Sequence, residues 1–177
     1  MPEGDVRQNA VNGLVSGWAN QSPQDAASFV ASLAPGKDQD RAALSVLSSW
    51  SNADPRSAAD WAAQFTESDL RKNAMRNLMN NWAQNDPAGA GKFIEGLSAG
   101  KSRDAAIESY VGQLSWQSPE FAAPFVNQIS DENQRFNYAQ QISNNFWRND
   151  PVAAEQWVAN LTLPEDKKKM LMRGKPK

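Results

Sequence analysis

Prolines recur along this chain at a constant interval. Pro23, Pro55, Pro87, Pro119 and Pro151 are each separated from the next by 32 residues, without an insertion or a deletion. A period of roughly 20–50 residues is typical of architectures in which similar supersecondary units stack on one another. The interval therefore predicts a tandem array rather than an irregular globular fold.

Other residues keep the same register, and positions 32 residues apart form columns. Five residues before each proline stand Trp18, Trp50, Trp82, Leu114 and Phe146. Three residues after it stand Ala26, Ala58, Ala90, Ala122 and Ala154, and six after it Phe29, Trp61, Phe93, Phe125 and Trp157. The columns predict units at residues 5–36, 37–68, 69–100, 101–132 and 133–164 of a single array, with residues 165–177 as a partial sixth unit or a cap.

Each unit is expected to hold two helices. A good N-cap residue precedes every proline: Ser22, Asp54, Asp86, Ser118 and Asp150. Proline then takes the first helical position, where its missing N–H costs nothing. The preceding helix, for example residues 70–82, is expected to span about 14 residues and the second about 11, with a short turn such as 84–85 between them. Gly36, Gly100 or the capping pattern at residues 66–69 separates the units.

The apolar columns define the expected core. A hairpin of this size cannot bury its own apolar face, so neighbouring units must stack to cover it. We expect the repeat core to contain Trp18, Trp50, Trp82, Trp61, Trp157, Phe93, Phe125, Ala58, Ala90 and Ala122. The fold class predicted is therefore all-α: an αα-superhelix, or solenoid, of five tandem helical hairpins plus a C-terminal half-repeat or capping helix.

The pattern resembles the α-solenoid repeats of the tetratricopeptide and HEAT kinds over residues 5 to about 164, in architecture only. Tetratricopeptide units have about 34 residues and use proline to close the second helix, and HEAT units are longer. The motif W-x4-P-x2-A-x2-[FW] of this chain matches neither signature. The resemblance implies binding to proteins, but no functional residue carries over.

Composition excludes several function classes. The chain contains no Cys and no His, which removes thiolate metal sites, cysteine nucleophiles and the commonest general base. Paired acids, such as Asp38 and Asp40, lie at expected helix starts, where negative charge suits the helix dipole better than it indicates catalysis. We expect no enzymatic activity, no cofactor and no metal.

Charge and hydropathy bear on partners. Residues 165–177 carry six Lys or Arg against two acids, so the rest of the chain is acidic within a net charge of −2. An acidic body argues against nucleic acid, and the Lys run fits a solvated cap face better than a nucleic-acid arm. No apolar run is long enough to insert into a membrane, and no signal peptide is present. The compartment stays open: cytoplasmic or, if a signal was removed, periplasmic or secreted.

The register continues past the fifth unit. Lys167 falls in the column of Arg7, Arg71, Arg103 and Arg135, in which Gln39 is the exception. Residues 164–173 are either a half-unit cap or the start of a unit cut from a longer array. The Arg column itself is expected to cap helix carbonyls, stack on Trp or pair with acids, although a row of anion sites is the alternative.

One side of the first helix of each unit is unusually rich in Ser, Asn, Gln and Gly, which are uncommon choices for an exposed helix face. Four columns make up this polar face: Gly13, Ser45, Asn77, Ser109 and Gln141; Ser16, Ser48, Asn80, Gly112 and Asn144; Gly17, Ser49, Asn81, Gln113 and Asn145; Asn20, Asn52, Gln84, Trp116 and Arg148. It is either a binding surface for a peptide, loop or glycan, with Asn80, Asn81, Asn144 and Asn145 as candidate contacts, or a place where neighbouring helices pack closely.

Units four and five depart from the consensus. Leu114 takes the aromatic slot, and Trp116, Phe121 and Trp147 appear outside the core columns. Such aromatics are typical interface anchors, although Trp116 could instead repack locally for the missing Trp. These features favour an interaction scaffold that binds a protein or peptide partner. The alternative is a structural spacer or self-assembling segment of a larger repeat protein, with self-association between copies.

Overall fold

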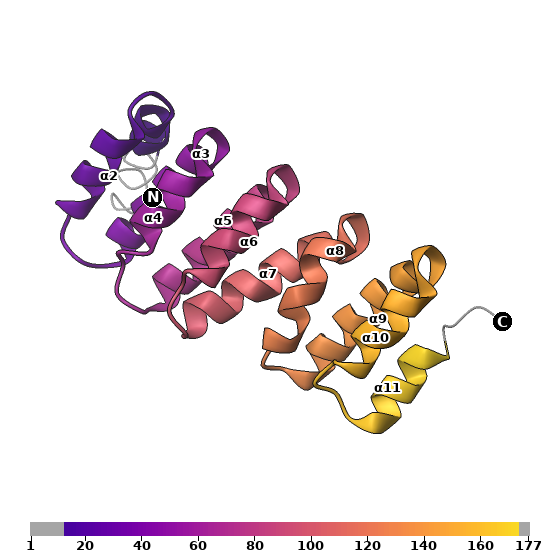
Figure 1. Ribbon diagram of the computed structural model, residues 1–177. Helices are drawn as coiled ribbons and strands as arrows, with labels where there is room; N and C mark the ends of the chain where they lie inside the picture. Colours follow the sequence, from indigo (N-terminus) through magenta and orange to yellow (C-terminus); the bar gives the residue numbers. More distant parts are fainter. Residues whose placement is uncertain (1–12, 174–177) are drawn as a thin grey trace, which may run out of the picture.

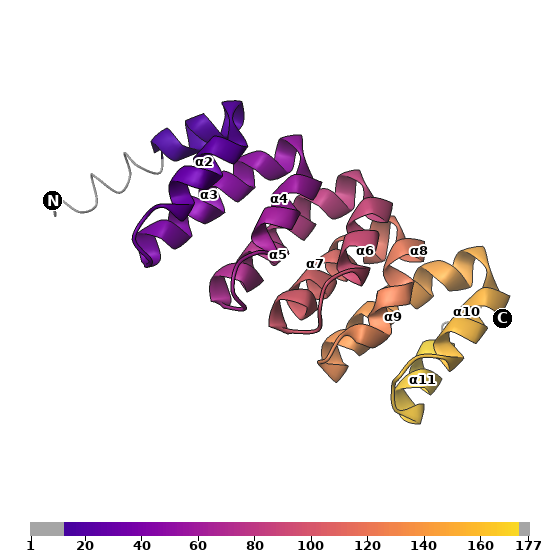
Figure 2. The same cartoon turned by 60° about the vertical axis from the view of Figure 1, so that its left-hand side comes forward.

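The computed structural model describes residues 13–173, and these residues are helical, with no strand among them. The expectation of an all-α fold is confirmed. Figures 1 and 2 show the helices stacked side by side in chain order, from the N-terminal end to the C-terminal end. The first eight residues of the expected first unit, including Arg7, lie outside the described residues, as do Lys175 and Lys177.

Long and short helices alternate along the chain. The long helices are α3 (Lys37–Ala53), α5 (Asp69–Asn85), α7 (Lys101–Gln117) and α9 (Glu132–Asn149). The short helices are α2 (Pro23–Ala31), α4 (Pro55–Ala62), α6 (Pro87–Glu95), α8 (Pro119–Ala122) and α10 (Pro151–Ala159), and residues 13–21 are also helical. The last helix is α11 (Glu165–Met172).

A single residue joins each long helix to the short helix that follows it. Asp54 donates its backbone N–H to Trp50 O at 2.9 Å, and its carboxylate accepts from Ser57 N at 3.0 Å. The bonds to Ser57 hold the pKa of Asp54 below its usual value. Asp86 and Asp150 cap their helices in the same way, whereas Ser22 and Ser118 make no side-chain cap bond. The expected turn at residues 84–85 was wrong, because the long helix continues for 17 residues up to the cap residue.

The core lies between the rows of helices and largely follows the columns. Trp50, Trp82, Phe93, Phe125 and every residue of the Ala column are buried, and Trp61 and Trp157 are half-buried against the same core. Trp18 is an exception to the expectation, since 41% of its surface is exposed. It pairs with Phe29 at 5.7 Å between ring centroids, but that ring is itself exposed.

The fourth short helix is broken. Pro124 has no N–H to continue an α-helical ladder, and α8 ends after four residues. The chain continues as the 3₁₀-helix η1 (Ala123–Gln128). This tighter winding still brings Phe125 and Val126 into the core.

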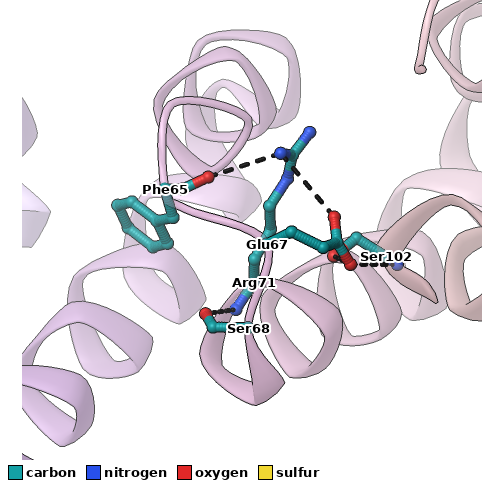
Figure 3. Close-up of polar contacts among 5 residues, drawn as sticks. All are labelled: Phe65, Glu67, Ser68, Arg71 and Ser102. Atoms are coloured by element: carbon teal, nitrogen blue, oxygen red, sulfur yellow. Dashed lines mark hydrogen bonds and ion pairs between the residues drawn. The ribbon is translucent and has the colours of Figure 1, made fainter. Parts of the chain in front are cut away.

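The loops between units are tied by side chains. Arg71 donates from Nη1 to Phe65 O at 3.3 Å, in the loop that follows α4, and lies 3.8 Å from Glu67 (Figure 3). Gln39, in the same column, donates its amide to Val30 O and Leu33 O at 3.1 and 3.2 Å. Gln39 thus bonds to a carbonyl in the last turn of α2, whereas Arg71 bonds to a loop carbonyl and faces an acid, and Arg103 bonds to the Gln128 side chain.

Tyr110 links one unit to the one before it. Its hydroxyl donates to Pro87 O at 2.8 Å, beside Gly91, where an added Cβ would lie 2.9 Å from the phenolic oxygen. Burial, with the nearby Glu95 and Asp86 carboxylates, raises the pKa of Tyr110 from 10.0 to about 12. The unfolded chain therefore loses this proton first, so the stabilisation is complete below pH 10.0 and is lost as the pH rises toward 12.

The absorbance of tyrosinate tests this. The chain has two Tyr, and we expect the native protein to show a transition near pH 12 that Tyr110→Phe removes. In denaturant both tyrosines should ionise near pH 10. A native transition near pH 10 that disappears in Tyr110→Phe would show that the phenol is not desolvated.

Candidate interaction surface on the long helices

Hydrogen bonds between neighbouring long helices run along the polar face. Ser16 Oγ lies 3.4 Å from Ser49 Oγ, and Asn81 Nδ2 donates to Asn52 Oδ1 at 3.3 Å. Further along, Gln84 Nε2 donates to Gln113 Oε1 at 2.8 Å. The small and amide side chains thus let adjacent helices approach and bond, which supports the packing interpretation for this part of the face.

Asn80 bonds to two residues of the next long helix. Its Oδ1 accepts from Ser109 Oγ at 2.6 Å and from Gln113 Nε2 at 3.2 Å, both on α7. These bonds occupy its oxygen and leave its NH₂ group to donate. Asn81 uses the other end of its amide: Nδ2 donates to Asn52, and Oδ1 remains available as an acceptor. Two adjacent residues on α5 therefore offer one donor and one acceptor to a ligand.

Two cavities meet at Asn80. One, of about 240 Å³, lies between α3 and α5, with Ser48, Asn77 and Asn81 among its polar lining and Leu44, Leu47 and Leu78 among its apolar lining. The other, of about 370 Å³, lies over α5, α7 and α9, and Arg76, Glu108 and Tyr138 line it together with Ser109, Gly112 and Gln113. The sequence had not singled out Arg76, Glu108 or Tyr138, because they stand outside the four polar columns. The packed face thus keeps recesses that can receive a side chain.

The four asparagines named from the sequence differ in their surroundings. Asn80 is half-buried in the bonded network, and Asn81 is exposed beside it. Asn144 is exposed on α9, and Asn145 accepts at 2.9 Å from Asn149 of its own helix. The structure therefore brings Asn80 and Asn81 together and leaves Asn144 and Asn145 on a separate helix.

Trp116 belongs to the polar face. It lies three, four and seven residues after Gln113, Gly112 and Ser109, on the same side of α7, and 66% of its surface is exposed. It is not a substitute for the missing core Trp, because Tyr110 supplies the aromatic ring, 5.0 Å from Phe125 and edge-on to it. The local repacking interpretation of Trp116 was wrong.

Phe121 lies on α8, three residues after Ser118, which joins α7 to α8. Its side chain is 38% exposed, less than that of Trp116. Its position on the short helix separates it from the polar columns. We therefore treat Trp116, and not Phe121, as the aromatic contact of the polar face.

Trp147 was expected at an interface, and that expectation was wrong. Only 2% of its surface is exposed, and Nε1 donates to Leu171 O of α11 at 3.0 Å. Its neighbour Phe146 keeps the column pairing, with its ring centroid 5.4 Å from that of Trp157. Trp147 is thus a core residue between α9 and α11. Its column, with the small residues Ala19, Ser51, Ala83 and Ser115, was the signal that could have revealed this, since all four are buried.

Helix α11 also uses its cationic residues for contacts within the chain. Lys167 Nζ donates to Glu132 at 2.7 Å and lies 5.4 Å from the centre of the Phe136 ring. Lys168 donates to Ala159 O at 3.1 Å, at the end of α10. These contacts support the interpretation of α11 as a cover over the fifth unit.

Substitution of Asn80 tests whether its bonds to α7 stabilise the packing of the two helices. Asn80→Ala removes the acceptor of Gln113 and one of the two acceptors of Ser109, which keeps Arg76 O at 3.0 Å, so we expect a loss of about 1–2 kcal/mol in the free energy of unfolding. The matched change Asn144→Ala, in the same column but without a bond to a neighbouring helix, should stay within about 0.5 kcal/mol of wild type. Urea unfolding followed by circular dichroism measures both, and equal losses would show that the α5–α7 bonds add no stability.

The described residues contain no group of three or more His, Cys, Asp or Glu placed to hold a metal ion. None of the helices within residues 13–173 is both long enough and apolar enough to cross a membrane. Searches against protein-family models, curated proteins and solved structures found no match to this chain.

Proposed function

We propose that this chain is a superhelical array of five 32-residue hairpins, followed by a C-terminal half-repeat or capping helix, and that it works as a non-enzymatic scaffold. Its partner is a protein or peptide segment, and the contact surface is the polar face of the long helices. The observation that carries the proposal is Trp116, a large side chain that is 66% exposed on the same side of α7 as the amide network.

The chemistry of the face suits an extended peptide. Its main chain carries one N–H and one C=O per residue, and these need partners when they leave water. Asn80 and Asn81 offer a donor and an acceptor side by side on α5. The cavity between α3 and α5 has no ionisable lining residue, so it favours a neutral side chain. Trp116 supplies an aromatic anchor of the kind that dominates peptide interfaces.

Selection from a random peptide library tests this function. The affinities of the selected peptides would be measured for wild type, Trp116→Ser and Val152→Ser. Val152 is the matched control because it is 68% exposed but lies on the short helix α10. We expect Trp116→Ser to weaken binding about 30-fold, equivalent to the ~2 kcal/mol of an interface hot spot, and Val152→Ser to leave it unchanged. No selected peptide, or equal losses in both variants, would contradict the proposal.

The second candidate function is self-association as a structural segment. The exposed residues Leu14, Trp18 and Phe29 favour it, since they line an apolar cavity of about 390 Å³. Sedimentation velocity over a range of concentrations distinguishes the two functions. Self-association is favoured if wild type forms oligomers that Phe29→Ser dissociates and if no peptide binds.

A further inference from the structure

The largest cavity among those described lies away from the polar face. It has a volume of about 590 Å³ and separates the loop after α2 from the loop after α4. Trp61, Phe65 and Leu70 form apolar parts of its wall, and Gln39 lies in it as well. Its only ionisable lining residues are Asp40 and Asp69, so it is a partly aromatic recess with a negative rim.

One unit later, a network of side chains ties the corresponding loops together. Arg71 bonds to Phe65 O and faces Glu67 at 3.8 Å. Glu67 Oε1 accepts from Ser102 N at 2.9 Å and from Ser102 Oγ at 2.8 Å, across the gap to the next unit (Figure 3). A cation, a carboxylate and a hydroxyl thus bridge the two loops.

All three members of that network are replaced at the cavity. The register puts Gln39 in the column of Arg71, Pro35 in the column of Glu67, and Leu70 in the column of Ser102. Gln39 is shorter than arginine, and its amide is already bonded to Val30 O and Leu33 O. Neither Pro35 nor Leu70 can form the bridge, so the space between the loops stays open.

We propose that this cavity binds the arginine side chain of a partner protein or peptide. The guanidinium would enter the open space beside Gln39, with Asp40 supplying the negative charge. The aromatic wall suits a cation whose stem is apolar, and this chain already places Arg56 over Phe93 at 5.5 Å. The site does not depend on the polar face, and it adds a charged contact to that of the neutral cavity between α3 and α5.

The proposal is tested with a small probe rather than with an unidentified partner. N-acetyl-arginine N-methylamide is titrated into ¹⁵N-labelled protein while the Trp61 indole signal is followed by NMR. The neutral analogue N-acetyl-citrulline N-methylamide is the reference ligand. We expect saturable shifts at Trp61 with a dissociation constant on the order of 1 mM for arginine, and binding at least about fivefold weaker for citrulline. Equal affinity for the two compounds would overturn the proposal.

Variants locate the site. Gln39→Arg introduces at the cavity the arginine that other units carry in this column. Because Arg71, Arg103 and Arg135 occupy the same column, the fold should be kept. We expect this variant to lose the arginine response. Asp40→Asn should weaken arginine binding about three- to tenfold, whereas the neighbouring Asp38→Asn, outside the cavity, should not. Asp69 is the poorer choice because Lys72 already pairs with it at 3.0 Å. An arginine response that survives both Gln39→Arg and Asp40→Asn would place binding elsewhere and overturn the proposal.

Discussion

Trp147→Ala is expected to lower the free energy of unfolding by about 3–5 kcal/mol, as large truncations in protein cores do. The side chain is 2% exposed, and its removal leaves a cavity between α9 and α11 and removes the indole hydrogen bond to the Leu171 carbonyl. Trp116→Ala is the matched control, since it removes the same side chain from a position where 66% of the surface already meets water. It should change the free energy by no more than about 0.5–1 kcal/mol.

Chemical denaturation of the two variants beside wild type measures the difference. Trp147→Phe adds a third comparison, because it keeps most of the apolar contact and loses the bond to Leu171. We expect its loss to lie between those of the two alanine variants. A mild effect of Trp147→Ala, similar to that of Trp116→Ala, would mean that α11 does not pack over the fifth unit.

The second large effect concerns two tryptophans of one column. Trp50→Ala should cost about 3–5 kcal/mol, because the ring is 5% exposed and packs 6.1 Å from the Trp61 ring. Trp18→Ala should cost about 1–2 kcal/mol, since less apolar surface is buried around a ring that is 41% exposed.

Thermal and urea unfolding of both variants check this expectation. Equal costs would show that the column position alone decides the contribution, and that the exposure of Trp18 does not matter. In the array that we propose, each unit is coupled mainly to its neighbours, so Trp50→Ala should also lower the cooperativity of the transition.

Much of the fold could be predicted from the column register. The register placed the starts of the short helices at the prolines and put Ala58, Ala90 and Ala122 in the core, because helical spacing determines which residues share a side. It could not determine the length of the long helices. Residues 51–53 resemble a polar turn in the sequence, but they belong to α3, and Asp54 is the single residue between α3 and α4.

The candidate site was predicted less well. Trp116 and Trp147 were both assigned to an interface, although the column of Trp147 holds the small, buried residues Ala83 and Ser115, and the column of Trp116 is exposed throughout the described residues. For the asparagines, spacing does not reveal which neighbour covers a side chain. Asn80 bonds to the next helix, whereas Asn144 does not, although they share a column.

The footprint of a selected peptide tests the central claim of a binding face on the long helices. We would record the side-chain amide signals of Asn80, Asn81 and Gln113, together with the Trp116 indole signal, with and without the peptide. These residues gather on α5 and α7, so our account predicts that all four signals shift together at saturation. Shifts confined to the short helices α4, α6 and α10, with these four signals unchanged, would contradict it.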